Sequence, residues 1–263
     1  MSLKANLKVK KTRSSGGLTG ILGLLSFSTI LPLNIHTSIQ EMTRFTWLWP
    51  IIGGLIGIVV GFLGFLLIDV IHLYQLIAAA LIYSFAIWFT GFHHLDGLVD
   101  FGDGMMAHGD PQRRINIMRD QRIGTGGLAY FFMVAIITFA SIASAPAATI
   151  FFILFVSEIS AKMGIITCCT FSAPYANGTG KYFIEAMNPK LLILAMIITL
   201  VLGFLALNTA GILGIVGGLI GGLIMALVAR RKFVYTTGDI LGASNEVSRM
   251  IALLVMILSL QII

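Results

Sequence analysis

The sequence contains few charged residues and few cysteines. Asp, Glu, Lys and Arg make up 11% of its 263 residues, whereas soluble domains contain roughly a quarter. So little charge, together with 57% hydrophobic residues, excludes an ordinary soluble domain and predicts a polytopic membrane protein. The two cysteines, Cys168 and Cys169, are adjacent in an apolar run. They match no common zinc or redox spacing, so we interpret them as packing residues.

Seven apolar segments are each long enough to cross roughly 30 Å of hydrocarbon. A further apolar patch near 18–33 carries several hydroxyl residues and Pro32, and we expect it to be interfacial or re-entrant. We therefore predict an all-α fold, a polytopic transmembrane helical bundle that forms a single integral membrane domain over residues 1–263. The predicted spans lie at 47–71, 73–91, 126–144, 147–170, 190–208, 211–229 and 247–263.

The basic residues lie almost entirely on one side of this topology. Of the 17 Lys and Arg residues, five precede the first apolar patch and eleven lie in or beside segments 36–46, 92–125, 171–189 and 230–246, which leaves only Lys162 inside a span. Short cytoplasmic loops are enriched in Lys and Arg, so we predict a multi-pass plasma-membrane protein with these segments in the cytoplasm. No clear cleavage site follows the basic tail, so no cleavable signal is expected. We therefore interpret the net charge of +6 as a signal for the orientation of the protein in the membrane, and we expect no nucleic-acid partner. The formation of a homo-oligomer is left open.

Three aspartates follow the second predicted span. Asp96, Asp100 and Asp103 are spaced by four and then three residues, which places them on one face if the segment is helical. Three like charges beside lipid favour a bound divalent cation, and oxygen ligands suit magnesium or manganese. The alternative is a solvated helix end that binds nothing.

The same segment continues with residues that suit a phosphate. Arg119 and Arg122 precede Gly124 and Thr125 at the start of the next span. A helix N-terminus offers free backbone N–H groups and the positive end of the helix dipole. An ordinary loop and helix cap use the same residues, but the neighbouring aspartates and arginines favour a phosphate site.

Two further cytoplasmic segments carry polar residues. Segment 171–189 includes a turn around Asn177 with donors for a phosphate or a sugar, and a plain connecting loop explains it equally well. In segment 235–246, Asp239 and Glu246 are seven residues apart and share a face if helical. A helix cap is the alternative role for Asp239.

Some polar and small residues fall inside the spans. Glu158 and Lys162 are four residues apart and are predicted to pair, either as a structural link or as a substrate contact. Glycines repeated every four residues allow close approach of helices, so we interpret both such stripes as packing surfaces. The stripes are Gly53, Gly57 and Gly61, and Gly214, Gly218 and Gly222.

Three stretches of the chain resemble the adenosylcobinamide-GDP ribazoletransferase family, also called cobalamin synthases. They are HLDGLVDFGDG at 94–104, IMRDQRIGT at 117–125 and TGDILGA at 237–243. Their order and spacing and the all-membrane length agree with the family over most of the chain. The chain departs from many relatives at Thr236, where they have glycine, and near Asn177, where they have an arginine.

This resemblance implies a magnesium-dependent transferase of a phosphorus-containing group. Such an enzyme transfers the phosphocobinamide part of adenosylcobinamide-GDP to α-ribazole or α-ribazole 5′-phosphate and releases GMP, at a late step of vitamin B12 synthesis. Asp96, Asp100 and Asp103 would then bind Mg²⁺. Together with Asp239, which would be a further metal ligand or the general base, they would form the catalytic residues. The residues expected to bind substrate are His94, Arg119, Arg122, Gly124, Thr125, Lys181 and Glu246.

Two other functions fit part of the pattern. The CDP-alcohol phosphotransferases of phospholipid synthesis share the pattern D-x2-D-G-x2-A at 100–107, but His108 stands where they have arginine and Ile117 where they have glycine. A cation transporter uses intramembrane carboxylates as an ion path. Against a transporter, the aspartates lie at one cytoplasmic rim and no inverted repeat is visible.

Overall fold

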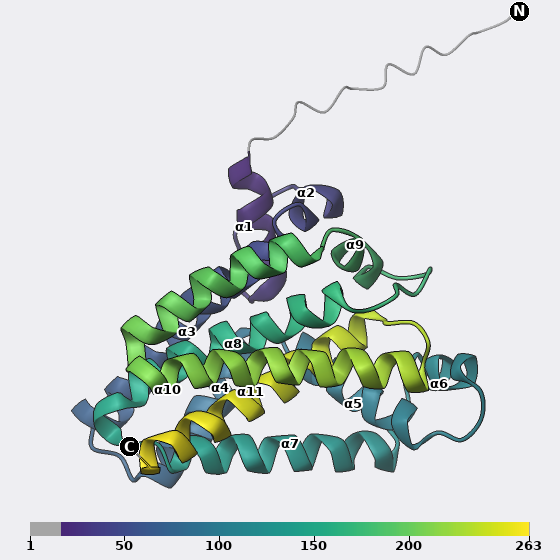
Figure 1. The fold of residues 1–263 in the computed structure, drawn as a ribbon. Coiled ribbons are helices and arrows are strands. Elements are labelled where there is room, and N and C mark those ends of the chain that lie inside the picture. The colour runs from purple at the N-terminus through teal and green to yellow at the C-terminus, as the bar shows by residue number, and fades with distance from the viewer. Residues whose placement is uncertain (1–16, 263) are drawn as a thin grey trace, which may run out of the picture.

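The computed structural model describes residues 17–262, and these residues form helices joined by loops (Figure 1). This range contains no strand, only an isolated bridge between Pro174 and Thr236. The predicted all-α fold is therefore confirmed; the basic N-terminal tail lies outside the described residues. The helices are α1 (Gly17–Ser28), α2 (Ile39–Thr43), α3 (Trp49–Phe65), α4 (Gln75–Phe89), α5 (His93–Met106), α6 (Pro111–Met118), α7 (Thr125–Ala143), α8 (Ile150–Thr170), α9 (Gly180–Glu185), α10 (Pro189–Lys232) and α11 (Gly238–Ile262).

Five stretches of the described helices are long and apolar enough to cross a membrane. Helices α4 and α5 meet this criterion only together, as a pair bent by 92°. Helix α1 has 12 residues, fewer than the roughly 20 that a span needs, which agrees with an interfacial or re-entrant segment. The five stretches are Thr46–Val70, Thr125–Ala143, Ala147–Thr170, Pro189–Lys232 and Gly238–Ile262.

The longest helix, α10, is a hairpin of two helices. Leu207 and Asn208 have non-helical backbone angles, and the φ of Asn208 is 50°, in the left-handed region that asparagine tolerates better than most residues. The two halves run in opposite directions (Figure 1), with the backbones of Gly203 and Gly211 in contact. The predicted boundary between the spans 190–208 and 211–229 falls at this turn.

Two predicted spans need correction. The segment predicted at 73–91 is α4, which has only 15 residues, because Gly91 and Phe92 adopt left-handed φ angles of 67° and 60° and turn the chain sharply into α5. The last span begins at Gly238, before the predicted residue 247. Hydropathy missed its first turns because they are polar and are buried against other helices instead of lipid.

Helix α8 forms the centre of the bundle. Residues 156–169 are all buried, and the helix packs against α3, α10 and α11. Both glycine stripes lie against it, with Gly57 on the backbone of Phe155 and Gly218 on the backbone of Ser160. The stripes are therefore packing surfaces, as predicted. The two adjacent cysteines of α8 are free thiols buried in the same core.

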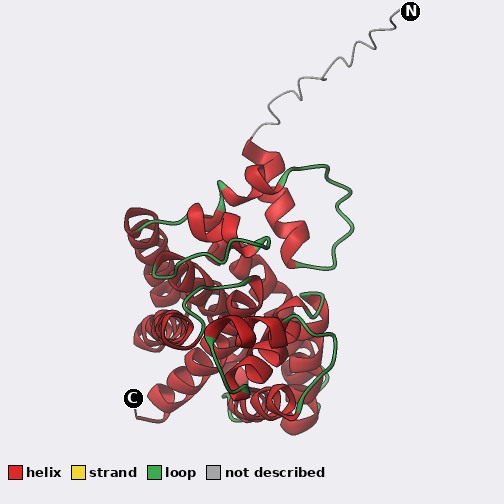
Figure 2. Ribbon diagram, turned by 90° about the vertical axis from the view of Figure 1, so that its right-hand side faces the viewer, coloured by secondary structure: helices red, strands yellow, loops and turns green. Residues whose placement is uncertain are grey.

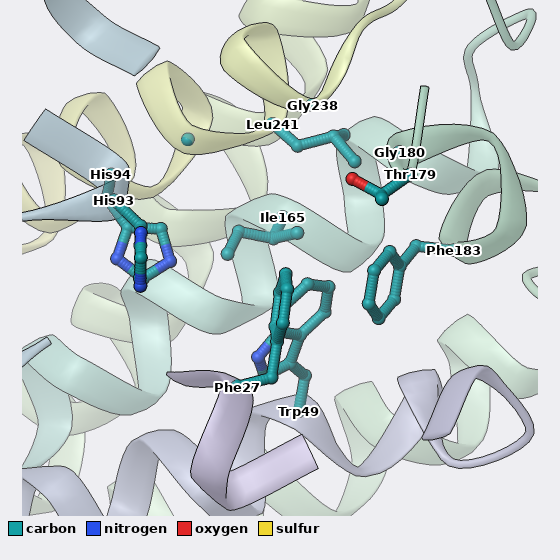
Figure 3. A pocket seen from close by; sticks show the side chains of 11 residues that line it. Phe27, Trp49, His93, His94, Ile165, Thr179, Gly180, Phe183, Gly238 and Leu241 are labelled. Atoms are coloured by element: carbon teal, nitrogen blue, oxygen red, sulfur yellow. The ribbon is translucent and has the colours of Figure 1, made fainter. Parts of the chain in front are cut away.

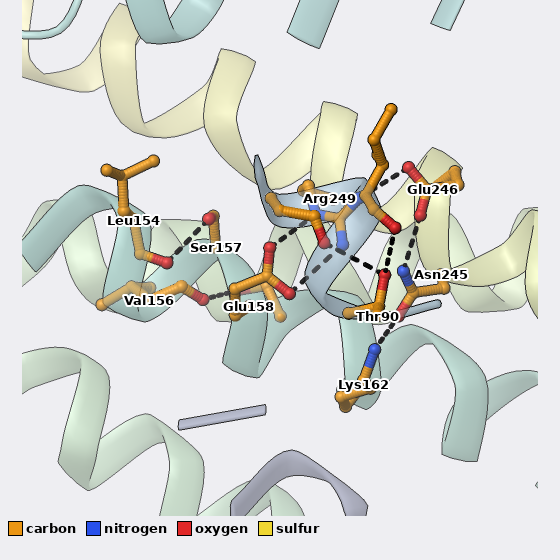
Figure 4. A network of polar contacts seen from close by, with 12 residues as sticks. Thr90, Leu154, Val156, Ser157, Glu158, Lys162, Asn245, Glu246 and Arg249 are labelled. Carbon is orange, nitrogen blue, oxygen red and sulfur yellow. Dashed lines mark hydrogen bonds and ion pairs between the residues drawn. The ribbon is translucent and has the colours of Figure 1, made fainter. Parts of the chain in front are cut away.

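A buried network of charged side chains links α8 to α11 (Figure 4). Arg249 donates to Glu158 at 2.8 Å and to Glu246 at 2.5 Å. Lys162 donates to Asn245 at 2.6 Å, and Asn245 donates to Glu246 at 2.9 Å. The predicted pair of Glu158 with Lys162 is therefore wrong. Arg249 takes the place of Lys162 because its planar guanidinium reaches both oxygens of Glu158.

Candidate functional site

Helix α5 carries the three predicted aspartates across the ends of two other helices. A Cβ on Gly97 would lie 2.6 Å from the carbonyl oxygen of Asp239, at the start of α11. A Cβ on Gly102 would lie 2.8 Å from the carbonyl oxygen of Gly126 and 2.9 Å from the Cα of Gly127, at the start of α7. Because these two positions lack side chains, α5 approaches both helices closely and brings its aspartates to their N-terminal ends.

The loop after α8 is held beside the N-terminus of α11. The backbone N–H of Tyr175 donates to the Thr236 carbonyl at 3.0 Å, and the N–H of Thr236 donates to the Ala173 carbonyl at 2.8 Å. Gly180 then packs backbone to backbone on Gly238. The three polar segments singled out in the sequence therefore meet at one end of the bundle, the end that faces the viewer in Figure 2.

A pocket of about 540 Å³ opens where these segments meet. Its charged residues are Asp96 and Asp100 from α5, Asp239 from α11, and Arg119 and Asp120 from the loop after α6. We refer to it as the acidic pocket. The charges of Asp96 and Asp239 repel that of Asp100, so a cation would be stabilised here. The polar residues that complete the lining are Gln121, Asn177, Thr179 and Thr237.

Two of the charged side chains are held by neighbours. Arg119 donates from Nη2 to the carbonyl oxygen of Asn177 at 2.6 Å, and its guanidinium carbon lies 4.9 Å from the ring centre of Tyr175. The hydroxyl of Thr237 donates to the carboxylate of Asp239 at 3.2 Å. These contacts tie Arg119 to the loop after α8 and orient Asp239 in the first turn of α11.

Asp103 does not line the acidic pocket and lies at the N-terminus of α7. Its two carboxylate oxygens accept hydrogen bonds from the backbone N–H groups of Gly124 at 2.7 Å and Gly127 at 2.8 Å. A carboxylate in this position is stabilised by the helix dipole. Asp103 caps α7, and the N–H of Gly124, expected to bind a phosphate, is bound to Asp103 instead.

Four other predicted binding residues are not part of the acidic pocket. The side chain of Arg122 is 89% exposed and pairs with Asp120 at 2.8 Å, and these contacts hold the pKa of the Asp120 carboxyl below its usual value. Thr125 is exposed in the first turn of α7. Lys181 pairs at 3.7 Å with a glutamate one turn away on α9. Glu246 is buried in the charged network of Figure 4.

His94 lines a second, smaller pocket. This pocket, of about 70 Å³, is formed largely by ring side chains, Phe27, Trp49, Phe183 and His93 (Figure 3). We refer to it as the aromatic pocket. Sequence reasoning missed it because these rings come from α1, α3, α9 and α5. No spacing rule connects residues so far apart, and single aromatic residues are ordinary in apolar helices.

The magnesium site stays a prediction, and the acidic pocket shows which carboxylates could hold the ion. Within the described residues, no group of three His, Cys, Asp or Glu side chains is arranged to hold a metal ion. The carboxylates of the acidic pocket nevertheless suit magnesium, which commonly binds through one or two carboxylates together with substrate phosphates. The pocket therefore fits a cation shared between the protein and a phosphorylated substrate better than a site made of three aspartates alone.

Comparisons with known proteins identify one family. The family model for cobalamin-5-phosphate synthase matches residues 20–257. An adenosylcobinamide-GDP ribazoletransferase of Methanococcoides burtonii is 30% identical over 253 residues, covering 92% of this chain and 93% of the relative. A protein of the same name from Methanosarcina barkeri is 27% identical, and the match covers 90% of this chain and 90% of the relative. One from Thermococcus kodakarensis is 34% identical, and the match covers 65% of this chain and 73% of the relative. No solved structure matches. The chain therefore belongs to the cobalamin-5-phosphate synthase family and is a membrane-embedded transferase of cobalamin synthesis.

Proposed function

We propose that this chain transfers the phosphocobinamide group of adenosylcobinamide-GDP to α-ribazole or α-ribazole 5′-phosphate and releases GMP. The observation that carries the proposal is the acidic pocket, in which Asp96, Asp100, Asp239 and Arg119 come together from separate segments. Carboxylates and a guanidinium in one pocket suit a reaction at a diphosphate, where catalysis depends on positioning and on charge stabilisation. The family and the names of the relatives suggest the substrates.

Magnesium would be held by Asp96 and Asp100, with Asp239 as a further ligand or as the base. Asp96 and Asp100 lie one turn apart on α5 and both reach the acidic pocket. When bound, the ion neutralises charge on the transferred phosphoryl group and on the leaving phosphate. Asp103 is left out of this set because both of its oxygens are bound to backbone N–H groups of α7.

The side chains of the pocket have two further roles in this proposal. Arg119 binds paired oxygens of the donor diphosphate, for which its planar guanidinium is suited. A ribose hydroxyl of the acceptor attacks the phosphorus atom that carries cobinamide, and the bond from that phosphorus to the GMP oxygen breaks. The hydroxyl proton passes to a carboxylate. Asp239 is the candidate, since Thr237 orients it.

We further propose that the acidic pocket faces the cytoplasm from the plasma membrane. Four arginines between 113 and 122 lie in the segment that lines the pocket, and three basic residues at 230–232 end the helix that precedes α11. Short loops rich in Lys and Arg remain in the cytoplasm. The pocket would then open toward the compartment that supplies nucleotides.

The direct test uses purified protein in lipid nanodiscs with adenosylcobinamide-GDP, α-ribazole and magnesium. We expect GMP and the completed corrinoid in equal amounts, and neither product after chelation of magnesium or in Asp100→Asn. Release of CMP from a CDP-linked donor, without GMP, would identify a CDP-alcohol phosphotransferase. Movement of ions in proteoliposomes without GMP release would identify a transporter. Either result contradicts the proposal.

A further inference from the structure

The rings that line the aromatic pocket stack on one another and offer aromatic faces to a ligand. Trp49 and Phe183 stack with ring centres 4.7 Å apart and 27° between their planes. Phe27 lies nearly parallel to His93, with 6.4 Å between ring centres and 9° between planes. Figure 3 shows Phe27 and Trp49 below the pocket, Phe183 on one side and the two histidines on the other. Planar ligands are stabilised by stacking on such rings.

The aromatic pocket adjoins the acidic pocket. Thr179 and Gly238 line both. A Cβ placed on Gly238 would meet no atom closer than 3.9 Å, so the junction between the pockets has room for a group of that size. The two pockets are therefore placed as a molecule with a flat ring at one end and a reactive oxygen at the other would require. A nucleoside, with its base and its ribose hydroxyls, has this form.

The aromatic pocket offers few side-chain hydrogen-bonding groups, namely His93, His94, the Thr179 hydroxyl and Trp49. Nε1 of Trp49 already donates to the hydroxyl of Ser28 at 2.8 Å. His94 is 8% exposed, and its buried Nδ1 has no hydrogen-bond partner among the described residues. Guanine presents several donors and acceptors, and burying them unpaired is costly. A benzimidazole-type base presents one ring nitrogen, which a single histidine satisfies, so the lining favours the benzimidazole type.

We propose that the aromatic pocket binds the planar benzimidazole-type base of the acceptor nucleoside, with His94 donating a hydrogen bond to its unsubstituted ring nitrogen. The base stacks among Phe27, Trp49 and Phe183, and the ribose extends through the shared junction toward the carboxylates of the acidic pocket. The inference rests on the proposed function for the identity of the acceptor. It also gives α1 a role, because this short helix supplies Phe27 as one wall of the acceptor site.

The test measures equilibrium binding and so does not depend on turnover. Protein in nanodiscs is titrated by calorimetry with α-ribazole, GMP and adenosine, each alone. Phe27→Leu removes one stacking ring from a side chain that is 41% exposed, and Phe204→Leu, at a 50% exposed position on α10, is the matched control. We expect Phe27→Leu to weaken α-ribazole binding roughly fivefold or more. Binding of GMP should not change, and Phe204→Leu should bind all ligands like the wild type.

A second comparison isolates His94. The indole analogue of α-ribazole keeps the shape of the base and replaces its acceptor nitrogen with C–H. His94→Phe keeps a ring of similar size and removes the hydrogen bond. We expect this variant to weaken binding of α-ribazole to the level of the indole analogue and to leave binding of the analogue itself unchanged.

Several results would overturn the inference. Weaker binding of GMP or adenosine to Phe27→Leu would assign the aromatic pocket to the donor. The base would not bind in this pocket if Phe27→Leu bound α-ribazole like the wild type, or if the wild type did not bind α-ribazole at all. The same conclusion would follow if His94→Phe weakened binding of α-ribazole and of its indole analogue equally. Failure of the proposed function is a separate observation, the absence of GMP release from the complete reaction mixture.

Discussion

The carboxylate of Asp103 accepts a hydrogen bond of 2.7 Å from the backbone N–H of Gly124. This contact separates Asp103 from the two aspartates that share its helical spacing, since Asp96 and Asp100 line the acidic pocket. Three carboxylates on one helix therefore have two structural roles. Replacing aspartate by asparagine should therefore have opposite effects on the stability of the protein at Asp100 and at Asp103.

Asp100→Asn is expected to abolish turnover and to leave the protein folded. The change removes a proposed magnesium ligand, and it also removes a charge that Asp96 and Asp239 repel, so the thermal unfolding midpoint should stay the same or rise. Turnover assays and thermal unfolding in detergent measure the two effects. Full activity of Asp100→Asn at low magnesium would contradict the proposed metal site.

Asp103→Asn is expected to act on stability. It weakens the charge-assisted hydrogen bonds to Gly124 and Gly127, which should lower the free energy of unfolding by on the order of 1–2 kcal/mol. The magnesium concentration for half-maximal activity should remain that of the wild type. A large increase in that concentration, with unchanged stability, would return Asp103 to the metal ligands.

Arg119→Ala is expected to raise the apparent KM for adenosylcobinamide-GDP more than tenfold. A charge-assisted contact to phosphate contributes on the order of 2 kcal/mol, and about 1.4 kcal/mol corresponds to a factor of ten. The KM for α-ribazole should change little. Arg122→Ala is the matched control, because its exposed side chain already pairs with Asp120. Steady-state kinetics with each substrate varied in turn give the two KM values for both variants. A larger increase of the KM for adenosylcobinamide-GDP in Arg122→Ala than in Arg119→Ala would show that the diphosphate contact is assigned to the wrong arginine.

Arg249→Leu is expected to destabilise the bundle by roughly 3–5 kcal/mol, because it leaves the buried carboxylates of Glu158 and Glu246 without their partner. Adding Glu158→Gln and Glu246→Gln to this variant should restore part of the loss. Lys181→Ala, which breaks an exposed pair, should cost less than about 1 kcal/mol. Unfolding in micelles provides the measurement. No recovery in the triple variant would argue against uncompensated charge as the cause.

Cysteine labelling tests the orientation in the membrane. Single cysteines at Gln112, Asn177 and Tyr235, all exposed at the pocket end of the bundle, should react with an impermeant maleimide only from the cytoplasm, in a background without the two native cysteines. Asn245 lies in the same predicted segment as Tyr235, but it is fully buried and cannot serve as a reporter. Ala148, exposed between α7 and α8, should react only from outside. Reaction of the first three from outside would reverse the topology.

The helices and the three polar segments could be predicted because their signals are local. Long apolar runs give a span its length, and the kink at Asn208 falls between two such runs. In a chain with 11% charged residues, the polar residues of a site stand out against their surroundings. The helical spacing of Asp96 and Asp100 correctly placed both on one helix.

The pairings between distant residues could not be predicted. Glu158 has one basic residue four positions away, Lys162, and another on α11, Arg249, and only the packing of α8 against α11 decides between them. Likewise, Phe27 and Phe183 meet with ring centres 5.3 Å apart, although more than half of the chain separates them. Such contacts depend on how the helices pack, and the spacing of residues along the sequence does not predict that packing.

The network between α8 and α11 has a consequence for the biogenesis of the protein. Arg249 is 91 residues from Glu158, and Asn245 is 83 residues from Lys162, so α8 is synthesised well before its partners. A charged side chain at the centre of a membrane helix costs roughly 2.5–3.5 kcal/mol on scales derived from translocon insertion. Until α11 has been made, α8 carries two such side chains without the partners of the finished bundle. We therefore expect α8 to reach its final stability in the membrane only after α11 has been made, and a chain that ends before Gly238 to lack the partners of Glu158 and Lys162 on α11.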